Sequence, residues 1–167
     1  PGLEHRVGGL EKTDKTGTIS YDPDNHDFMC RLRAEKIRRI VADIPPTKIH
    51  GPDSGDLVLV GWGSTYGSIQ AAVRTAQAKG LAVSHVHLRH LNPLPADLEG
   101  ILRRFRRVLV PEMNLGQLSF ILRGRYLIDA RGLNQVRGQP FKVSTILSAI
   151  DSELAELLGD STQEGAA

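Results

Sequence analysis

Cysteine is almost absent from this sequence of 167 residues, in which Cys30 is the only one. A single cysteine excludes an internal disulfide, a CxxC zinc site and an iron–sulfur cluster ligated by this chain alone. Since no cysteine–histidine arrangement is visible around it, we interpret Cys30 as a small buried hydrophobic residue rather than a nucleophile. Any iron–sulfur cluster would have to reside on another chain.

Aromatic residues and an excess of one charge are also lacking. Aromatic side chains make up 5% of the sequence, and 21 Lys and Arg stand against 19 Asp and Glu. The arginine-rich stretches at 31–39 and 103–107 offer bases little to stack on, so nucleic acid is not expected as a partner. No apolar run is long enough to cross a membrane, and 40% apolar residues predict a soluble domain, with the cytoplasm as its expected compartment.

Several catalytic motifs are missing: the sequence has no Gly-x-Ser-x-Gly elbow, no HExxH and no Walker sequence. The turn GWGSTYG follows an apolar run, but the spacing of its glycines departs from the dinucleotide-binding fingerprint. These glycines favour a tight strand-to-helix turn. Gly61, Gly63 and Ser64 remain weak candidates for binding a phosphate or a cofactor.

The first part of the chain predicts an irregular segment followed by a helix. The sequence begins at Pro1, has no methionine before Met29 and shows no apolar stretch of a signal peptide, so we expect a piece of a longer protein. Residues 1–27 show no sustained periodicity, whereas apolar residues recur at helical spacing over 28–44, with Asn25 or Asp27 as the expected cap. Two prolines end this helix, and residues 45–55 are expected to form a linker.

Beyond this linker, apolar runs alternate with helical patterns up to residue 158, and residues 159–167 are expected to be a disordered tail. This alternation predicts an α/β fold: a three-layer, mostly parallel, Rossmann-like sheet with helices on both faces. The expected strands are 56–62, 81–88, 107–113 and one within 133–138; the expected helices are 64–79, 96–105, 114–127 and 143–158. Their expected apolar stripes include Ile69, Ala72, Val73 and Ala76 in 64–79, Leu98, Ile101 and Leu102 in 96–105, Leu115 in 114–127 and Leu158 in 143–158.

Two polar features in this region invite a functional interpretation. His85, His87 and His90 lie close in sequence, but no carboxylate or cysteine nearby completes a ligand set, so structural histidines are favoured and no metal site is predicted. Glu112 ends the third expected strand, at the edge where open α/β sheets bind ligands. A functional carboxylate, a cap of the next helix and a contact with another subunit all remain open for it.

Several longer motifs resemble a known family: GLEHRVGGLEK, DLVLVGWGSTYGSIQAAV, LRHLNPLP, and VPEMNLGQL followed by NQVRGQPF. They are similar to the C-terminal part of the α subunit of 2-oxoglutarate:ferredoxin oxidoreductases, over residues 1–158. The resemblance implies that residues 1–44 are the end of a thiamine-pyrimidine domain with a connecting helix. It also implies that residues 56–158 are a transketolase C-terminal-like domain.

The resemblance further implies an activity for the complete enzyme. Thiamine diphosphate, held with Mg²⁺, decarboxylates a 2-oxoacid, the acyl group passes to coenzyme A, and an iron–sulfur cluster carries the electrons to ferredoxin. In the family, the diphosphate and cluster sites belong to the β subunit. We therefore expect this chain to bind no cofactor alone, to serve assembly with the β subunit and to be inactive in isolation. Alternatives are a subunit acting on pyruvate or another 2-oxoacid, and a nucleotide- or coenzyme-binding Rossmann-like module.

Residue by residue, the resemblance carries over to two groups. Glu4, His5 and Gly9 match a stretch near the family's domain junction and are candidates for lying close to the active site, although Arg6 stands where many members have Asp. Matching positions in the later domain imply structural and subunit-contacting roles rather than catalytic ones. The expected interface residues are Glu112, Asn114, Gly116 and Gln117.

Overall fold

The computed structural model describes residues 2, 4 and 7–164, with side chains up to residue 159. The chain divides into two compact units, which we describe separately. The N-terminal unit comprises Pro1–Ile44 and Asn92–Leu94; the sheet unit comprises Pro45–Leu91 and Pro95–Ala167. Among the helices so described, none is both long and apolar enough to cross a membrane.

The sheet unit is built on a mixed sheet in which, within the described residues, the strand order is β1-β3-β2-β4-β5. β2 pairs in parallel with β3 and β4, β4 pairs in parallel with β5, and β1 pairs with β3 in the antiparallel sense. This arrangement confirms the predicted mostly parallel sheet. The strands are β1 (Ile49–His50), β2 (Gly55–Trp62), β3 (Val83–Leu88), β4 (Phe105–Glu112) and β5 (Ala130–Asn134).

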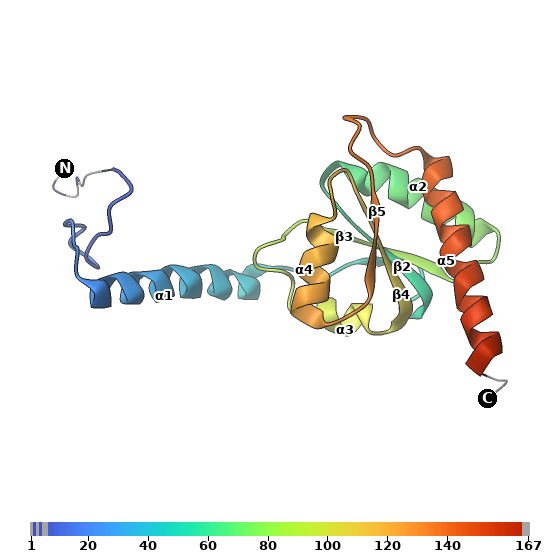
Figure 1. Ribbon diagram of the computed structural model, residues 1–167, viewed down its shortest axis with the longest axis horizontal. Coiled ribbons are helices and arrows are strands. Elements are labelled where there is room, and N and C mark those ends of the chain that lie inside the picture. The colour runs from blue at the N-terminus through green and yellow to red at the C-terminus, as the bar shows by residue number, and fades with distance from the viewer. Residues whose placement is uncertain (1, 3, 5–6, 165–167) are drawn as a thin grey trace. The chain divides into compact units, whose positions relative to one another are not determined.

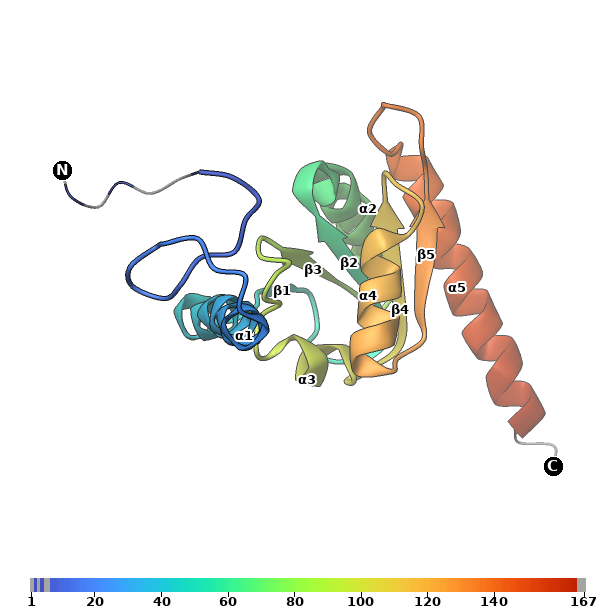
Figure 2. The same cartoon turned by 60° about the vertical axis from the view of Figure 1, so that its left-hand side comes forward.

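Helices cover both faces of this sheet, as predicted. α2 and α5 lie against one face, and α3 and α4 lie against the other (Figures 1 and 2). The continuous apolar sequence of β2 follows from this, since a strand covered on both sides buries both sets of alternating side chains. The helices are α2 (Tyr66–Ala78), preceded by a 3-10 turn at Gly63–Thr65, α3 (Leu98–Leu102), α4 (Gln117–Tyr126) and α5 (Val143–Glu164).

The core of the sheet unit is largely the one that the sequence predicts. The buried residues of α2 are the four residues of the predicted apolar stripe, and they pack with Leu57 and Leu59 of β2. Ile146 and Ile150 of α5 close the same cluster and are fully buried. The members of the α2 stripe are Ile69, Ala72, Val73 and Ala76.

Four expectations for the sheet unit are wrong in detail. β1 forms inside the expected linker 45–55, because Ile49 pairs with Val86 at the open edge of β3. The strand expected within 133–138 is β5 at 130–134. α5 continues to Glu164, so the expected disordered tail is helical over 159–164; one glycine inside a helix costs only about 1 kcal/mol and does not end it. Leu115 and Leu158, both expected on buried stripes, are 87% and 71% exposed.

The N-terminal unit contains α1 (Pro23–Arg39) followed by a 3-10 turn at Ile40–Asp43. The cap is Asp22, not Asn25 or Asp27: its side chain accepts from the backbone N–H of Asp24 at 2.9 Å. The helix starts earlier than the apolar pattern suggests, because Pro23 is well suited to a first helical position. Within the described chain α1 has no buried residue, so its predicted apolar stripe is exposed or half-buried.

The segment before α1 is more ordered than the predicted irregular stretch. A bridge between Lys12 and Ile19 closes a short turn, and Ser20 N–H donates to the carbonyl of Glu11 at 3.0 Å. Gly17 has φ +70°, a conformation that glycine adopts without steric cost. The turn brings Glu11 and Lys12 next to the beginning of α1, where Asn25 Nδ2 donates to the Lys12 carbonyl at 3.1 Å.

Candidate functional site

The first candidate region is the carboxyl edge of the sheet, which we define as the turns 61–65 and 112–117 that follow β2 and β4. Its centre is Glu112, whose side chain is 0% exposed. The backbone N–H groups of Leu118 and Ser119 donate to this carboxylate at 2.8 and 2.9 Å. Asn114 Nδ2 and Trp62 Nε1 donate to it at 3.0 and 3.3 Å. Glu112 therefore occupies the N-terminus of α4, where an anion is favoured, and its oxygens are engaged.

The other predicted interface residues build the turn around Glu112. Asn114 Oδ1 accepts from the backbone N–H groups of Gly116 and Gln117 at 2.7 and 2.9 Å. Gly116 has φ +96°, and a Cβ there would lie 3.1 Å from side-chain atoms of Asn134 and Ser119. A glycine is needed at this position for both reasons. Gln117 is exposed.

The chain's only tryptophan, Trp62, is a member of this site that sequence reasoning missed. It ends β2, fifty residues before Glu112, and the two meet because β2 and β4 are parallel neighbours. A hint was present in the sequence, since Trp62 and Glu112 both end strands expected to lie in one parallel sheet. The sequence did not show that those strands are adjacent.

The glycines of the turn 61–65 have structural explanations. A Cβ on Gly61 would approach Ile69 Cδ1 to 2.4 Å and Thr65 Oγ1 to 2.9 Å, so only glycine fits without rearrangement. Gly63 has φ +58°, and Ser64 is exposed. Close strand-to-helix packing, the alternative favoured from the sequence, explains Gly61, and the positive φ explains Gly63.

Two of the three histidines lie on one face of β3 and form a cluster with its neighbours. His85 is fully buried, and its Nδ1 lies 2.7 Å from Gln70 Oε1. The ring centroids of His87 and His50 lie 5.8 and 5.6 Å from that of His85. Burial, reinforced by His87 and His50, lowers the pKa of His85 to about 3. The His85 ring is therefore neutral near pH 7. His90, the third histidine, is exposed and follows the end of β3.

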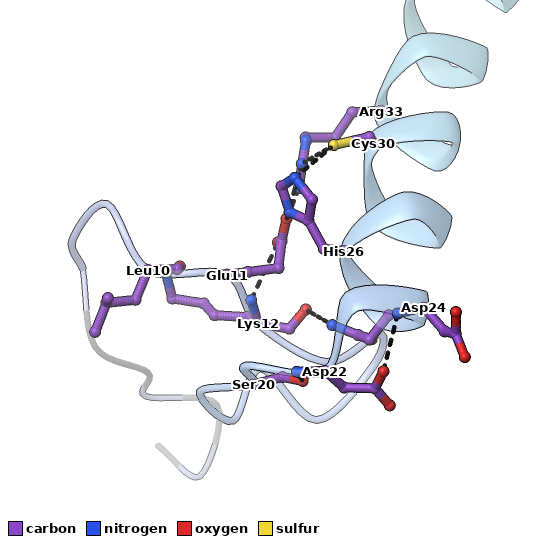
Figure 3. Close-up of polar contacts among 10 residues, drawn as sticks. Leu10, Glu11, Lys12, Ser20, Asp22, Asp24, His26, Cys30 and Arg33 are labelled. Carbon is purple, nitrogen blue, oxygen red and sulfur yellow. Dashed lines mark hydrogen bonds and ion pairs between the residues drawn. The ribbon is translucent and has the colours of Figure 1, made fainter.

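A second group of titratable side chains lies in the N-terminal unit (Figure 3). Both Glu11 oxygens accept from Arg33, at 3.1 and 3.0 Å, and His26 Nδ1 lies 2.9 Å from Glu11 Oε2. Hydrogen bonding from Arg33 is the main cause that lowers the pKa of Glu11 to about 2. Cys30 Sγ lies 3.7 Å from His26 Nε2 and 3.2 Å from Arg33 Nη2.

Two expectations for Cys30 are therefore wrong. The residue is exposed rather than buried. It also has a histidine partner, because His26 precedes it by four residues on α1, and this spacing places both side chains on one face of a helix. The sequence contained this spacing, but it becomes informative only once the helix is known to begin at Pro23 instead of Phe28.

The structure describes two of the three candidates near the expected active site, Glu4 and Gly9. Glu4 is exposed and accepts from the backbone N–H of Gly2 at 2.6 Å. Gly9 is exposed, with no atom within 4 Å of a notional Cβ. His5 lies outside the described residues. Their role remains a prediction.

The class of domain that this chain contains is an α/β domain with a mostly parallel sheet and a buried, hydrogen-bonded carboxylate at its carboxyl edge. A family model, "Pyruvate:ferredoxin oxidoreductase core domain II", matches residues 55–149, which is more than half of the chain. The chain belongs to this family, and the resemblance inferred from its motifs is confirmed.

Individual relatives narrow the family further. The chain is 47% identical to the 2-oxoglutarate oxidoreductase subunit KorA of Mycobacterium tuberculosis, over 97% of this chain and 25% of that protein. It is 35% identical to the 2-oxoglutarate synthase subunit KorA of Methanocaldococcus jannaschii, over 71% of this chain and 32% of that protein. The chain thus spans between a quarter and a third of the length of these relatives.

A solved structure agrees with these relatives. The 2-oxoglutarate:ferredoxin oxidoreductase from Magnetococcus marinus, with 2-oxoglutarate, coenzyme A and succinyl-CoA bound, superposes with a TM-score of 0.79 at 30% identity. The match covers 90% of this chain and 27% of that one. It shows that the α/β architecture described above is that of an oxidoreductase domain.

Proposed function

We propose that this chain is the C-terminal portion of the α subunit of a thiamine diphosphate-dependent 2-oxoglutarate:ferredoxin oxidoreductase, serving mainly subunit assembly. The complete enzyme would convert a 2-oxoacid, coenzyme A and oxidised ferredoxin into acyl-CoA, CO₂ and reduced ferredoxin. The observation that carries this proposal is the 47% identity to a 2-oxoglutarate oxidoreductase subunit over 97% of the chain. The cytoplasm is the compartment we propose for it.

The chemistry of the carboxyl edge supports assembly rather than catalysis. A general acid or base needs a carboxyl group that can exchange a proton with substrate. Glu112 instead accepts hydrogen bonds from the start of α4 and from Trp62 and Asn114 while fully buried. We infer that Glu112, Asn114 and Gly116 hold the turn before α4 in place and that the exposed Gln117 contacts another subunit.

The outer surface of α4 and its flanks supports a contact with another subunit. Phe120 is 78% exposed and Ile121 44%, and Leu115 and Leu127 at the two ends of the helix are 87% and 86% exposed. Large exposed apolar side chains that gather on one element are typical of protein interfaces. We propose the β subunit as the partner and ferredoxin as a partner of the assembled complex.

The residues of this chain do not by themselves fit the cofactors of such an enzyme. One cysteine cannot ligate an iron–sulfur cluster. The first N–H groups of α4, which could receive a diphosphate, are bonded to Glu112. We therefore propose that thiamine diphosphate, Mg²⁺, the cluster and coenzyme A are bound by the complete enzyme, with Glu4, His5 and Gly9 as the residues of this chain nearest to its active site.

Two assays test the enzymatic part of the proposal. The purified chain should show no turnover of 2-oxoglutarate with coenzyme A and a viologen dye, whereas the complete α subunit combined with the β subunit should turn over. Turnover by the chain alone would overturn the assembly role. The second assay compares 2-oxoacids as substrates of the complete enzyme. A preference for pyruvate, the substrate named in the family description, would overturn the assignment of 2-oxoglutarate.

The interface is tested by a charged substitution. Phe120→Asp in the complete α subunit should reduce co-purification with the β subunit at least tenfold without changing the helix content. Arg74→Glu, at an exposed position of α2 on the other face of the sheet, is the matched control and should retain the partner. Equal recovery of the partner with both variants would contradict the proposed surface.

A nucleotide- or coenzyme-binding module is the competing function. Its best feature is the turn 61–65, whose glycines are already explained by packing and a positive φ. Calorimetric titration with NAD, FAD and coenzyme A separates the two. Micromolar binding that disappears in Gly63→Val would favour the module over our proposal.

A further inference from the structure

Three side chains of different ligand chemistry converge in the N-terminal unit. Glu11, His26 and Cys30 each offer one ligand atom, and these atoms all lie within 4.8 Å of one another (Figure 3). His26 and Cys30 are held on one face of α1, and Glu11 is held opposite them by the turn that the Lys12–Ile19 bridge closes. The cluster therefore consists of an oxygen, a nitrogen and a sulfur donor from two backbone segments.

The centre of this cluster is occupied by a cationic group. Arg33 Nη2 lies 3.0 Å from Glu11 Oε2 and 3.2 Å from Cys30 Sγ, and Nη1 lies 3.1 Å from the second Glu11 oxygen. The Arg33 guanidinium thus places a positive charge between two of the ligand atoms, as a bound metal ion would. Its side chain is 54% exposed, so it can turn into solvent without leaving a cavity in a core.

The spacing of the ligand atoms suits a small tetrahedral ion. Bonds of about 2.0 to 2.3 Å to oxygen, nitrogen and sulfur place ligand atoms about 3.5 Å apart in a tetrahedral zinc site. The observed separations are 2.9 Å between Glu11 Oε2 and His26 Nδ1 and 3.7 Å between His26 Nε2 and Cys30 Sγ. Since an imidazole gives one nitrogen to a given metal, a modest rotation of the His26 ring is needed.

We propose that Glu11, His26 and Cys30 form a binding site for a thiophilic divalent cation such as Zn²⁺, with Arg33 as the cation that the metal displaces. A sulfur and an imidazole ligand disfavour Mg²⁺ and Ca²⁺, which prefer oxygen. On binding, Sγ loses its proton to solvent and forms the metal–thiolate bond, and water takes the fourth position. The proposed ion differs from the cofactors of the proposed enzyme, and the proposal does not depend on that function.

Cobalt provides the direct test, because a Co²⁺–thiolate bond absorbs light and Zn²⁺ replaces it without a colour of its own. The full 167-residue chain titrated with Co²⁺ should develop thiolate-to-cobalt absorption at one equivalent, and Zn²⁺ should abolish it. Cys30→Ser should lose this absorption and weaken Zn²⁺ binding at least tenfold. Arg33→Gln should strengthen Zn²⁺ binding at least tenfold, since the competing cation is gone.

A matched control lies two residues before Arg33 on the same helix. Arg31 pairs with Asp27 at 2.8 Å, outside the cluster, so Arg31→Gln should leave the affinity for Zn²⁺ unchanged. Circular dichroism of each variant checks that α1 is retained. The proposal is overturned if Arg33→Gln shows no cobalt–thiolate absorption while its helix content is intact, or if Cys30→Ser binds Zn²⁺ as tightly as the original chain.

Discussion

The N-terminal unit and the sheet unit contain helices with similar apolar periodicity but differ in what surrounds them. On α2, Ile69, Ala72, Val73 and Ala76 are 0% exposed, whereas the described residues of α1 include no buried one. α1 is joined to the preceding turn by polar contacts around Glu11. Periodicity thus indicates a helix in both places, but only tertiary packing decides whether its apolar face contributes to stability.

The difference predicts how free energy is distributed. Burying apolar surface stabilises by about 25 cal/mol per Å², so a fully buried side chain contributes on the order of 2 kcal/mol. Ion pairs exposed to water contribute little. We therefore expect the sheet unit to resist denaturant through its core and the N-terminal unit, which is held by polar contacts, to resist it less.

The largest expected effect is in the core of the sheet unit. Leu59→Ala should lower its free energy of unfolding by about 2 to 5 kcal/mol, because Leu59 is fully buried and leaves a cavity. Leu32→Ala, on α1 where Leu32 is 41% exposed, should change it by less than about 0.5 kcal/mol. Urea unfolding monitored by Trp62 fluorescence measures both. Similar losses for the two variants would remove the contrast between the units.

The next effect concerns the carboxyl edge. Glu112→Gln should destabilise the sheet unit by about 3 kcal/mol, since an amide cannot accept from the N–H groups of α4 with both of its atoms. Glu99→Gln is the matched control in the same unit: its pair with Arg103 is exposed, and the change should stay within about 0.5 kcal/mol. The same unfolding measurement decides, and a harmless Glu112→Gln would show that the buried carboxylate is dispensable.

A pH-dependent effect follows from the histidine cluster. The pKa of His85 is lowered from 6.5 to about 3, so between these values the unfolded chain binds more protons than the folded one. Stability is fully present above pH 6.5 and falls as the pH is lowered towards 3, by up to about 1.4 kcal/mol per pH unit from this residue. His85→Phe should flatten this dependence.

Thermal unfolding between pH 7 and pH 4 measures that slope. His90→Ala is its control, because His90 is exposed and should leave the slope as it is. An unchanged slope in His85→Phe would mean that another group causes the loss of stability in acid.

The smallest effect is expected in the N-terminal unit. Glu11→Gln removes the charge that binds Arg33 and should leave the unfolding of the sheet unit unchanged. It should raise amide hydrogen exchange over residues 7–20, because Glu11 ties this segment to α1. In the original chain the pKa of Glu11 is lowered to about 2, so the same loosening appears only as the pH falls from 4.5 towards 2. Equal amide hydrogen exchange in Glu11→Gln and in the original chain at neutral pH would show that Glu11 does not hold this segment to α1.

The local sequence pattern was sufficient to predict helices whose apolar residues recur at regular spacing. The buried stripe of α2 and the inward Leu98, Ile101 and Leu102 of α3 were predicted correctly, whereas the first helix ends at Arg39 and not at residue 44. β1 was missed because two residues carry no periodicity and its partner is another strand. Asp22 was missed as a cap because the helix begins before its apolar pattern does.

The candidate site divides in the same way. Glu112, Asn114, Gly116 and Gln117 could be singled out because a strand end, a short polar side chain and a glycine follow each other in sequence, and their interface role stays a prediction. Trp62 was missed because fifty residues separate it from Glu112, and the exposed Glu11–His26–Cys30 cluster was missed because Glu11 lies on a segment without periodicity. Contacts between distant segments depend on strand adjacency and on turns, which no local pattern encodes.

The sequence by itself determined the α/β class, most strands and helices, and the family, because these depend on residue spacing and on motifs that lie within short segments. Only the tertiary structure decided that Glu112 accepts hydrogen bonds from the start of α4 and that α1 has no buried residue among those described. It also decided that Cys30 is exposed beside His26. The physical reason is that burial and electrostatic surroundings are properties of what packs against a residue, and the chain position of that residue does not specify its neighbours in space.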